Sequence, residues 1–329
     1  MMRDTTLNLA LLAAVIVAAA LSLGVGYAPL SPATVARALF GGATPDAIIV
    51  QDIRLPRALL GVLVGASLGL SGAALQGLLR NPLAEPGIIG ASSTAALGAT
   101  VVFYFGLAGA SAFALPAAGM AGALLAVVLV YALAGRDASA LTLILAGVAV
   151  SAFASALTAL AINLAASAYA VLEITFWLLG SLADRSMQHV WIALPPMAVG
   201  WALLVSCARP LDALSLGEEA ARSLGIGLGF VRFRLIAGTA LCVGAAVAVS
   251  GAVGFVGLVV PHLLRPFVGH QPGRLLLPSA LGGAVLVVLA DIVVRLLSAG
   301  VEVRLGVVTA LVGAPFFLWL VLRTRRSLA

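Results

Sequence analysis

The stretch from residue 54 to residue 90, RLPRALLGVLVGASLGLSGAALQGLLRNPLAEPGIIG, decides the fold of this chain. It begins with an apolar run from residue 56 to about residue 79. As a helix, this run is long enough to cross a hydrocarbon core of roughly 30 Å at about 1.5 Å per residue. Three glycines four residues apart predict a smooth stripe where a second helix approaches closely: Gly61, Gly65 and Gly69.

A polar break, RNPLAEPG at residues 80–87, follows the apolar run. Its two prolines stand four residues apart and cannot sit inside one helix. Its carboxylate, Glu85, is costly in lipid unless water or protein covers it. The break therefore predicts a re-entrant or cytoplasmic loop between two apolar spans.

The composition identifies a membrane protein. Of the 329 residues, 63% are hydrophobic and 9% are charged, whereas soluble domains contain about 45–50% apolar and about 25% charged residues. We expect an all-α polytopic membrane protein that forms a single transmembrane domain over residues 1–329. Division at prolines, glycine–polar clusters and charges gives about ten transmembrane helices, at residues 7–27, 55–79, 88–107, 114–134, 141–164, 190–208, 228–250, 258–268, 275–298 and 305–323.

All 18 basic residues are arginine, and the formal charge is +6. A P-loop ATPase site needs a lysine on its phosphates, so this chain cannot carry one. With the N-terminus inside, 12 arginines fall on the cytoplasmic side and 6 outside, as the positive-inside rule requires. The charge thus indicates membrane orientation and no nucleic-acid partner. The two cysteines, Cys207 and Cys242, lack metal-ligand spacing and are expected to pack inside membrane helices, so no metal site is expected.

Two segments outside the spans have helical patterns of their own. The outer segment, 165–189, predicts a short surface helix at residues 171–179. The inner segment, ARPLDALSLGEEAARSLGIGLGFVR at residues 208–232, predicts a short helix from Leu216, with two acidic residues in its first turn where they suit the helix dipole. The small apolar face of this inner helix indicates either a linker packed on the bundle or a docking surface for a soluble partner.

Three blocks of the chain together resemble a known family. They are RLPR…RNPLAEPGIIG, GLVVPHLLRP and VEVRLGVVTALVGAPFFLWL, in this order between about residues 54 and 322. They resemble the permease subunits of type II ABC importers for vitamin B12, ferric siderophores and haem, the BtuC/FecCD family. The third block departs from the family at Arg304, where proline is usual, and this puts the entry of the last span in doubt.

The resemblance implies the partners of the chain. It implies a homodimer that encloses one pathway in the bacterial inner membrane, with about ten helices in each subunit. Two ATPase subunits on the cytoplasmic side would bind ATP and Mg²⁺, and a periplasmic substrate-binding protein would deliver the cargo. No cofactor is expected in this chain.

The resemblance also implies which residues carry each role. Cytoplasmic coupling helices at about 210–228 would contact the ATPases through Leu216, Gly217, Glu218, Glu219, Ala220, Arg222, Leu224 and Gly225. An outer basic cluster would dock the binding protein through Arg54, Arg57 and Arg295. A cytoplasmic gate would consist of Asn81, Leu83, Ala140 and Leu141. The pathway would be lined by Gly147, Ser151, Ser155 and Thr158, although small-residue helix packing alone also accounts for this spacing.

The resulting hypothesis is a permease subunit, not an enzyme, of an importer that moves an iron complex into the cytoplasm. We lean to haem over a ferric siderophore because the expected pathway is apolar and poor in fixed charge. The alternative is a vitamin B12 importer. An ion-coupled secondary transporter is disfavoured, since the acidic residues fall at span ends or loops and only His262 is a candidate coupling residue. We expect His262 to brace the bundle.

Overall fold

The computed structural model describes residues 2–26, 28–42, 44–109, 111, 113–135, 138–165, 167–297 and 303–328. These residues form helices and connecting turns, with no strand among them. The ten expected spans correspond to α1 (Met2–Gly24), α4 (Leu55–Leu78), α5 (Ala91–Tyr104), α6 (Ala114–Ala134), α7 (Ala140–Asn163), α9 (Met187–Val205), α12 (Leu228–Ser250), α13 (Val256–Leu264), α14 (Pro272–Leu297) and α15 (Leu305–Leu328). The predicted all-α polytopic fold is confirmed.

Length and apolar composition agree with a membrane bundle. Within the described part of the chain, seven helices are long and apolar enough to cross a membrane, and four shorter apolar helices accompany them. The expected surface helix is also present, as α8 (Ala168–Leu178). The inner segment forms two short helices, α10 (Ala208–Ser215) and α11 (Glu218–Ser223). The residue pattern predicted the second, and the family resemblance implied coupling helices over about 210–228.

The largest difference from the expected elements lies before α4. Helix α2 (Pro32–Phe40) was not predicted, and α3 (Pro45–Ile48) and the π-helix η1 (Ile49–Arg54) run directly into α4. The helix therefore begins well before Pro56. A π-helix appears mostly as a single turn inside a longer helix, and here the Leu55 N–H bonds to the Val50 carbonyl, five residues back.

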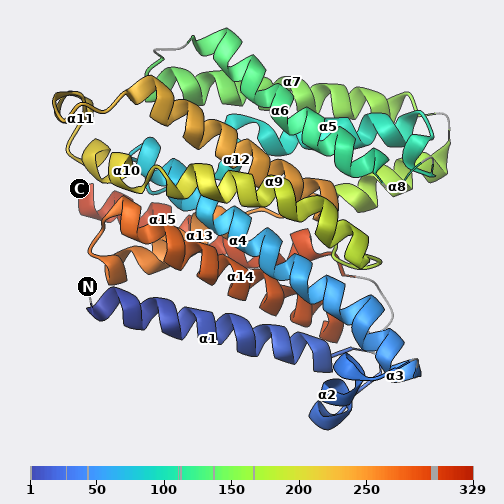
Figure 1. The fold of residues 1–329 in the computed structure, drawn as a ribbon. Helices are drawn as coiled ribbons and strands as arrows, with labels where there is room; N and C mark the ends of the chain where they lie inside the picture. Colours follow the sequence, from blue (N-terminus) through green and yellow to red (C-terminus); the bar gives the residue numbers. More distant parts are fainter. Residues whose placement is uncertain are drawn as a thin grey trace.

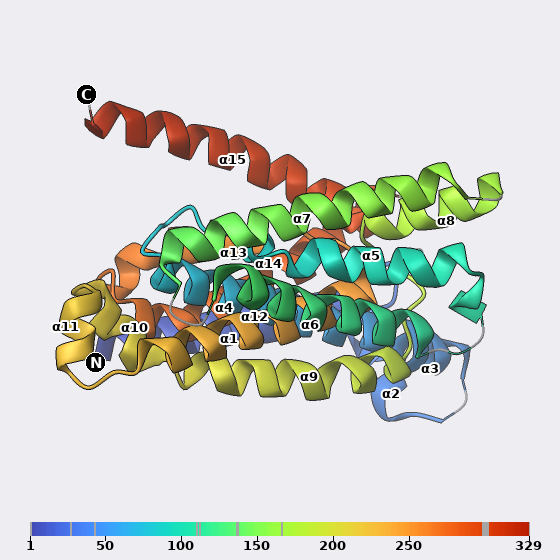
Figure 2. The same cartoon turned by 90° about the horizontal axis from the view of Figure 1, so that it is seen from above.

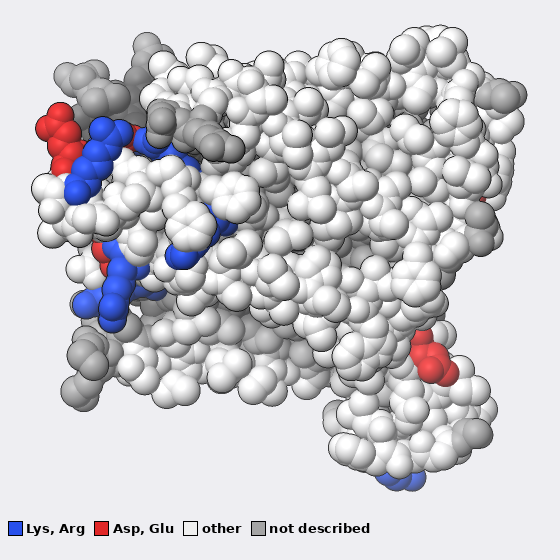
Figure 3. All heavy atoms as spheres, turned by 45° about the horizontal axis from the view of Figure 1, so that its top comes forward, with Lys and Arg blue, Asp and Glu red and all other residues white. Residues whose placement is uncertain are grey.

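The helices lie side by side and their ends divide into two groups (Figure 1). The start of α1, the end of α15, α10 and α11 lie at one end of the molecule, and α2, α3 and α8 lie at the other. Seen from above, α15 diverges from the bundle beyond α7 (Figure 2). On the face drawn in Figure 3, charged side chains gather at the end with α10 and α11, and the wide central band is uncharged. This arrangement is typical of a membrane-spanning bundle.

Glycines allow α4 to lie directly against α14. A Cβ on Gly69 would overlap the Ser279 carbonyl oxygen, and a Cβ on Gly65 would stand 2.7 Å from Ala284 Cα. Gly61 is less tightly packed, since a Cβ there would stand 3.1 Å from a methyl group of Val288 rather than against backbone at closer range. The predicted glycine stripe is therefore confirmed, with its closest contact at the inner two positions.

Two non-helical segments enter the bundle and meet there. One, 79–90, follows α4 and ends at Gly90, whose φ is +85°. Apart from the single 3-10 turn η2 (Pro86–Ile89), it is irregular. The other, 251–255, joins α12 to α13. The first turn of α13 packs against the middle of α4, because a Cβ on Gly257 would stand 2.9 Å from the Leu68 carbonyl and 2.6 Å from Pro86 Cδ. Of the two alternatives for the polar break, the re-entrant loop is the one observed.

We predict that Gly69→Ala destabilises the chain, because the added methyl meets backbone that cannot rotate away. Overpacking of this kind costs typically about 1–3 kcal/mol. Thermal unfolding of the purified chain in detergent measures the effect. Gly42→Ala is the matched control, since nothing lies within 4 Å of a Cβ at that glycine. Equal unfolding temperatures for the two variants would contradict the close α4–α14 contact.

Candidate translocation pathway and docking surfaces

A cavity of about 320 Å³ lies between α5, α7 and the end of α8. Two of the predicted pathway residues, Ser155 and Thr158, line it from α7, and Ser92 and Ser93 line it from the start of α5. Hydroxyls and small apolar side chains make up the wall, so the surface is weakly polar and carries no fixed charge: the lining consists of Ser92, Ser93, Ala96, Ser155, Thr158, Ala159, Ile162, Leu178 and Ala252.

The other two predicted pathway residues contact the re-entrant loop instead. The Ser151 hydroxyl donates to the Gly87 carbonyl at 3.4 Å, and a Cβ on Gly147 would overlap the Ile88 carbonyl. The structure therefore places Ser155 and Thr158 at the cavity and Gly147 and Ser151 where α7 packs on the loop. That all four line a pathway stays a prediction.

A second cavity of about 170 Å³ adjoins the first through two shared residues, Ser92 and Ala252. Glu85 lines it together with the two non-helical segments. The Glu85 Oε1 accepts a hydrogen bond from the Phe255 N–H at 2.7 Å. Glu85 belongs to a loop, as expected for the acidic residues, but the re-entrant path of that loop carries its carboxylate into the bundle.

The predicted cytoplasmic gate divides between two elements at the end of the molecule that holds α10 and α11 (Figure 1). Asn81 and Leu83 follow α4, and the Asn81 side-chain oxygen accepts the Leu83 N–H at 2.9 Å. Ala140 and Leu141 begin α7, where Leu141 is exposed. The gate assignment stays a prediction.

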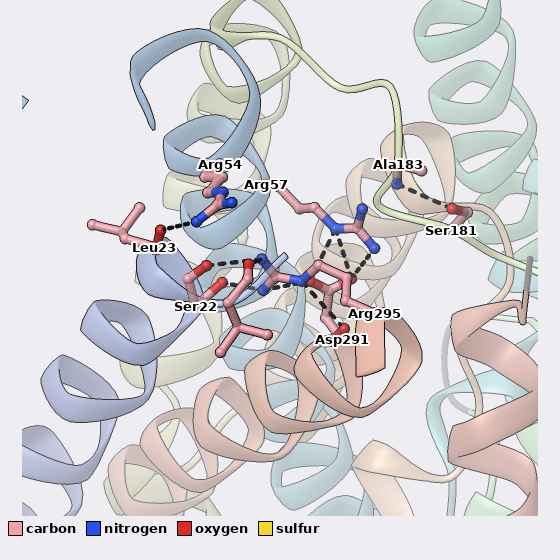
Figure 4. Close-up of polar contacts among 9 residues, drawn as sticks. Ser22, Leu23, Arg54, Arg57, Ser181, Ala183, Asp291 and Arg295 are labelled. Atoms are coloured by element: carbon pink, nitrogen blue, oxygen red, sulfur yellow. Dashed lines mark hydrogen bonds and ion pairs between the residues drawn. The ribbon is translucent and has the colours of Figure 1, made fainter. Parts of the chain in front are cut away.

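The three outer arginines turn inward rather than forming an exposed basic patch (Figure 4). Arg54 is 5% exposed and donates to the carbonyls of Leu23 (2.8 Å), Gly24 (2.9 Å) and Ala28. These carbonyls lie at and just beyond the end of α1, where helical backbone has no intrahelical partner. Arg54 therefore satisfies the end of α1.

Arg57 and Arg295 share one buried carboxylate (Figure 4). Arg57 binds Asp291 through two nitrogens, with Nε 2.9 Å from Oδ1 and Nη2 2.8 Å from Oδ1. Arg295 Nη2 lies 3.1 Å from Asp291 Oδ2, and Arg295 also donates to the Ser22 carbonyl at 2.8 Å. The side chain of Asp291 is 3% exposed and that of Arg295 is 7% exposed. Asp291 and Arg295 stand four residues apart on α14, a spacing that favours their pairing, whereas Arg57 reaches Asp291 from a different helix.

This outer arginine cluster (Arg54, Arg57, Asp291 and Arg295) ties α1, α4 and α14 together. Internal carbonyls and a carboxylate already accept hydrogen bonds from all three arginines. A docking role for these residues stays a prediction, and it would require their exposed edges or a rearrangement.

A second outer feature is a cavity of about 230 Å³ beside α8. It combines aromatic rings with both signs of charge. Arg304, the residue at which the family pattern breaks, lies over the Phe176 ring, with its guanidinium carbon 5.0 Å from the ring centroid. Burial lowers the pKa of Arg185, and the neighbouring Asp184 opposes that shift. The cavity is lined by Phe103, Glu173, Phe176, Trp177, Ser181, Ala183, Asp184, Arg185, Ser250 and Arg304.

The expected coupling helix presents two large apolar side chains to solvent. Leu216 is 72% exposed and Leu224 is 65% exposed. Glu218 has an internal role, because it lies 2.7 Å from the nearly buried Arg232 of α12. Glu219 and Arg222 are exposed on the same short helix. The structure therefore separates a residue that holds α11 in place from neighbours that face outward.

Two polar side chains of the bundle were not identified as a pair from the sequence. Gln76, an amide in the apolar helix α4, accepts a hydrogen bond from Arg265 and donates to the carbonyls of Ala84 (3.3 Å) and Gly257 (3.4 Å). A single amide in an apolar span was the available signal.

His262 packs edge-on against Phe316 of α15, with ring centroids 5.7 Å apart, which agrees with the expected bracing role.

We predict that Asp291→Asn strongly destabilises the chain, since it leaves two largely buried guanidinium groups without their carboxylate. Removing one partner of a buried ion pair costs about 3–5 kcal/mol. Thermal unfolding in detergent measures the loss, and Asp52→Asn, at an exposed aspartate of the same end, is the control. A shift no larger than that of the control would mean that the cluster contributes nothing to stability.

Known proteins are similar to this chain in sequence and in fold. A family model described as the FecCD transport family matches residues 13–323. A vitamin B12 import system permease protein BtuC from Salmonella typhimurium is 41% identical over 283 residues, which is 85% of each chain. The corresponding protein from Citrobacter koseri is 39% identical over 281 residues, covering 85% of this chain and 84% of that one.

A solved structure is also similar over nearly the full length. It shows a metal-chelate type ABC transporter in an inward-facing conformation. It superposes with a TM-score of 0.85 at 34% sequence identity and covers 97% of this chain and 99% of that chain. The likeness therefore extends to the arrangement of the helices and not only to short motifs.

Proposed function

The chain belongs to the FecCD transport family, and we propose that it is the permease subunit of an ATP-driven importer for a corrinoid of the vitamin B12 type. It is a multi-pass protein of the bacterial inner membrane. The observation that carries the cargo proposal is the 41% identity, over 85% of each chain, to permeases named for vitamin B12 import.

The cargo proposed here differs from the iron complex expected from the sequence. That lean depended on an apolar pathway with little fixed charge. Such a wall does not distinguish one large metal-containing macrocycle from another. It carries no charge that could select a cargo by its charge and no side chain that would bind the cargo's metal. The relatives named for vitamin B12 import therefore favour the alternative cargo of the sequence-based hypothesis, vitamin B12. The 34% identical metal-chelate transporter keeps an iron chelate as the second candidate.

The proposed partners follow from the family and are supported by three surfaces. The chain has no lysine and hence no Walker A site, so ATP hydrolysis belongs to separate subunits. The exposed Leu216 and Leu224 supply an apolar contact for those subunits. Large exposed apolar side chains on α7 and α15, such as Phe153 and Leu311, supply a face for a second copy around the pathway. The outer end would receive a binding protein.

We predict ATP-dependent accumulation of cobalamin in liposomes that contain this chain, its ATPase and its binding protein. Excess haem or ferric siderophore should not compete for uptake. Radiolabelled cobalamin retained on a filter measures the result, and omission of the ATPase is the control. Uptake of an iron complex but not of cobalamin would overturn the cargo. Uptake that follows a proton gradient without the ATPase would overturn the importer.

We also predict that Leu216→Asp combined with Leu224→Asp reduces association with the ATPase at least about tenfold without lowering the unfolding temperature. Charged side chains at these exposed positions remove the apolar contact but leave the Glu218–Arg232 pair intact. Co-purification of the ATPase measures association. Phe40→Asp, at a 93% exposed side chain of the opposite end, is the matched control. Full retention of the ATPase by the double variant would place the docking surface elsewhere.

A further inference from the structure

Glu85 is a carboxylate inside an apolar bundle, and the proposed function does not use it. Ionisable groups at this depth are costly and are generally retained for a function. Glu85 lies where the loop 79–90, which rises from α4, meets the segment 251–255, which leads into α13. Its Oε1 accepts the Phe255 N–H at 2.7 Å, and it lines the cavity that adjoins the α5–α7 cavity.

The residue that receives this bond has an unusual backbone. Phe255 has φ +67°, in the left-handed region that non-glycine residues rarely occupy. It is also the N-cap of α13, whose first N–H groups have no intrahelical acceptor. A carboxylate at this position satisfies one of these donors and interacts favourably with the helix dipole. The Glu85–Phe255 bond therefore holds the start of α13 in its left-handed turn.

The same loop contacts α7, the helix that carries the predicted pathway residues. Ser151 of α7 donates to the Gly87 carbonyl at 3.4 Å. On the other side, Phe255 packs against α15, because a Cβ on Gly313 would overlap the Phe255 side chain. The Glu85–Phe255 bond thus joins a loop that contacts α7 to a residue that contacts α15.

The loop also begins with two residues of the predicted cytoplasmic gate, Asn81 and Leu83. One residue, Ala84, separates Leu83 from Glu85, and three residues separate Asn81 from it. The Ala84 carbonyl accepts a hydrogen bond from the Gln76 amide at 3.3 Å. Displacement of Glu85 relative to α13 must therefore move the gate residues, since so short a connection cannot absorb it.

We propose that Glu85 is a positioning residue for transport. Its hydrogen bond to the Phe255 N–H ties the loop carrying Asn81 and Leu83 to α13 and, through Phe255, to α15. The gate then moves with α13 and α15 when ATP is hydrolysed. This inference rests on the proposed importer function but not on the identity of the cargo.

The first experiment tests the bond in the full purified chain without any cargo. Hydrogen–deuterium exchange at the Phe255 amide is compared between wild type, Glu85→Ala and Glu85→Gln. Loss of the acceptor in Glu85→Ala should accelerate exchange at least about tenfold. Glu85→Gln keeps a carbonyl oxygen as acceptor, so its exchange should stay within about threefold of wild type. Unchanged exchange in Glu85→Ala would overturn the proposal.

The second experiment measures cargo imported per ATP hydrolysed in liposomes that contain the complete transporter. Glu85→Ala should lower this ratio at least about fivefold while ATP hydrolysis continues, and Glu85→Gln should retain it. A merely structural role would lower uptake and hydrolysis together and leave the ratio unchanged. The ratio is informative because it is independent of how many complexes fold.

A glycine pair provides variants that leave Glu85 in place. A Cβ in Gly257→Ala would stand 2.6 Å from Pro86 Cδ and push the loop from α13, whereas in Gly254→Ala the nearest atom, Glu85 Oε1, lies 3.8 Å away. Only Gly257→Ala should lower the ratio. A ratio within about twofold of wild type in both Glu85→Ala and Gly257→Ala would overturn the proposal, as would equal losses in Glu85→Ala and Glu85→Gln. If wild type imports an iron complex instead of cobalamin, only the cargo assignment fails and the ratio is measured with that complex. If wild type imports nothing, the importer function and this inference both fail.

Discussion

Backbone N–H and C=O groups must find partners inside protein when water is absent, and this constraint shapes the centre of the bundle. Two non-helical segments, 79–90 and 251–255, meet there. In hydrocarbon such backbone is tolerated only where protein covers it or a cavity borders it. The few polar side chains of these helices supply the partners: Gln76 bonds to Ala84 and Gly257, Glu85 to Phe255, and Ser151 to Gly87. The polar side chains therefore occur where the irregular backbone needs hydrogen-bond partners, and the cavities border the same segments.

The same reasoning explains the two ends of the molecule. At the outer end, Arg54 and Arg295 donate to carbonyls at the end of α1, and Asp291 forms ion pairs with both Arg57 and Arg295. At the inner end, the Glu218–Arg232 pair fixes α11 on α12 and leaves apolar side chains facing solvent. The arginines at one end bond to acceptors within the chain, whereas the exposed residues at the other end are available to contact a partner.

Much of the fold could be predicted because hydrophobic length and glycine spacing are local signals. The ten spans, the surface helix α8 and the close approach at Gly65 and Gly69 all follow from residues near one another in the sequence. The direction of the outer arginines could not be predicted, since Arg57 and its partner Asp291 are 234 residues apart. The helical segment 45–54 was missed because polar residues and Pro56 conceal a helix that continues through a π-helical turn. The residues alone do not fix the cargo, because an uncharged wall carries little chemical information, and the proposal of a corrinoid rests on the named relatives.

We propose that the cavity lined by Ser92, Ser155 and Thr158 belongs to a pathway that opens alternately to the two sides of the membrane. The most direct test replaces Cys207 and Cys242 by alanine and places a single cysteine at Ser155 in the complete transporter. Labelling with a membrane-impermeant maleimide is then compared from each side, with and without trapped ATP. The account predicts that the side from which this cysteine is labelled changes with the nucleotide state. A cysteine that is never labelled, or that reacts from one side in every state, would contradict it.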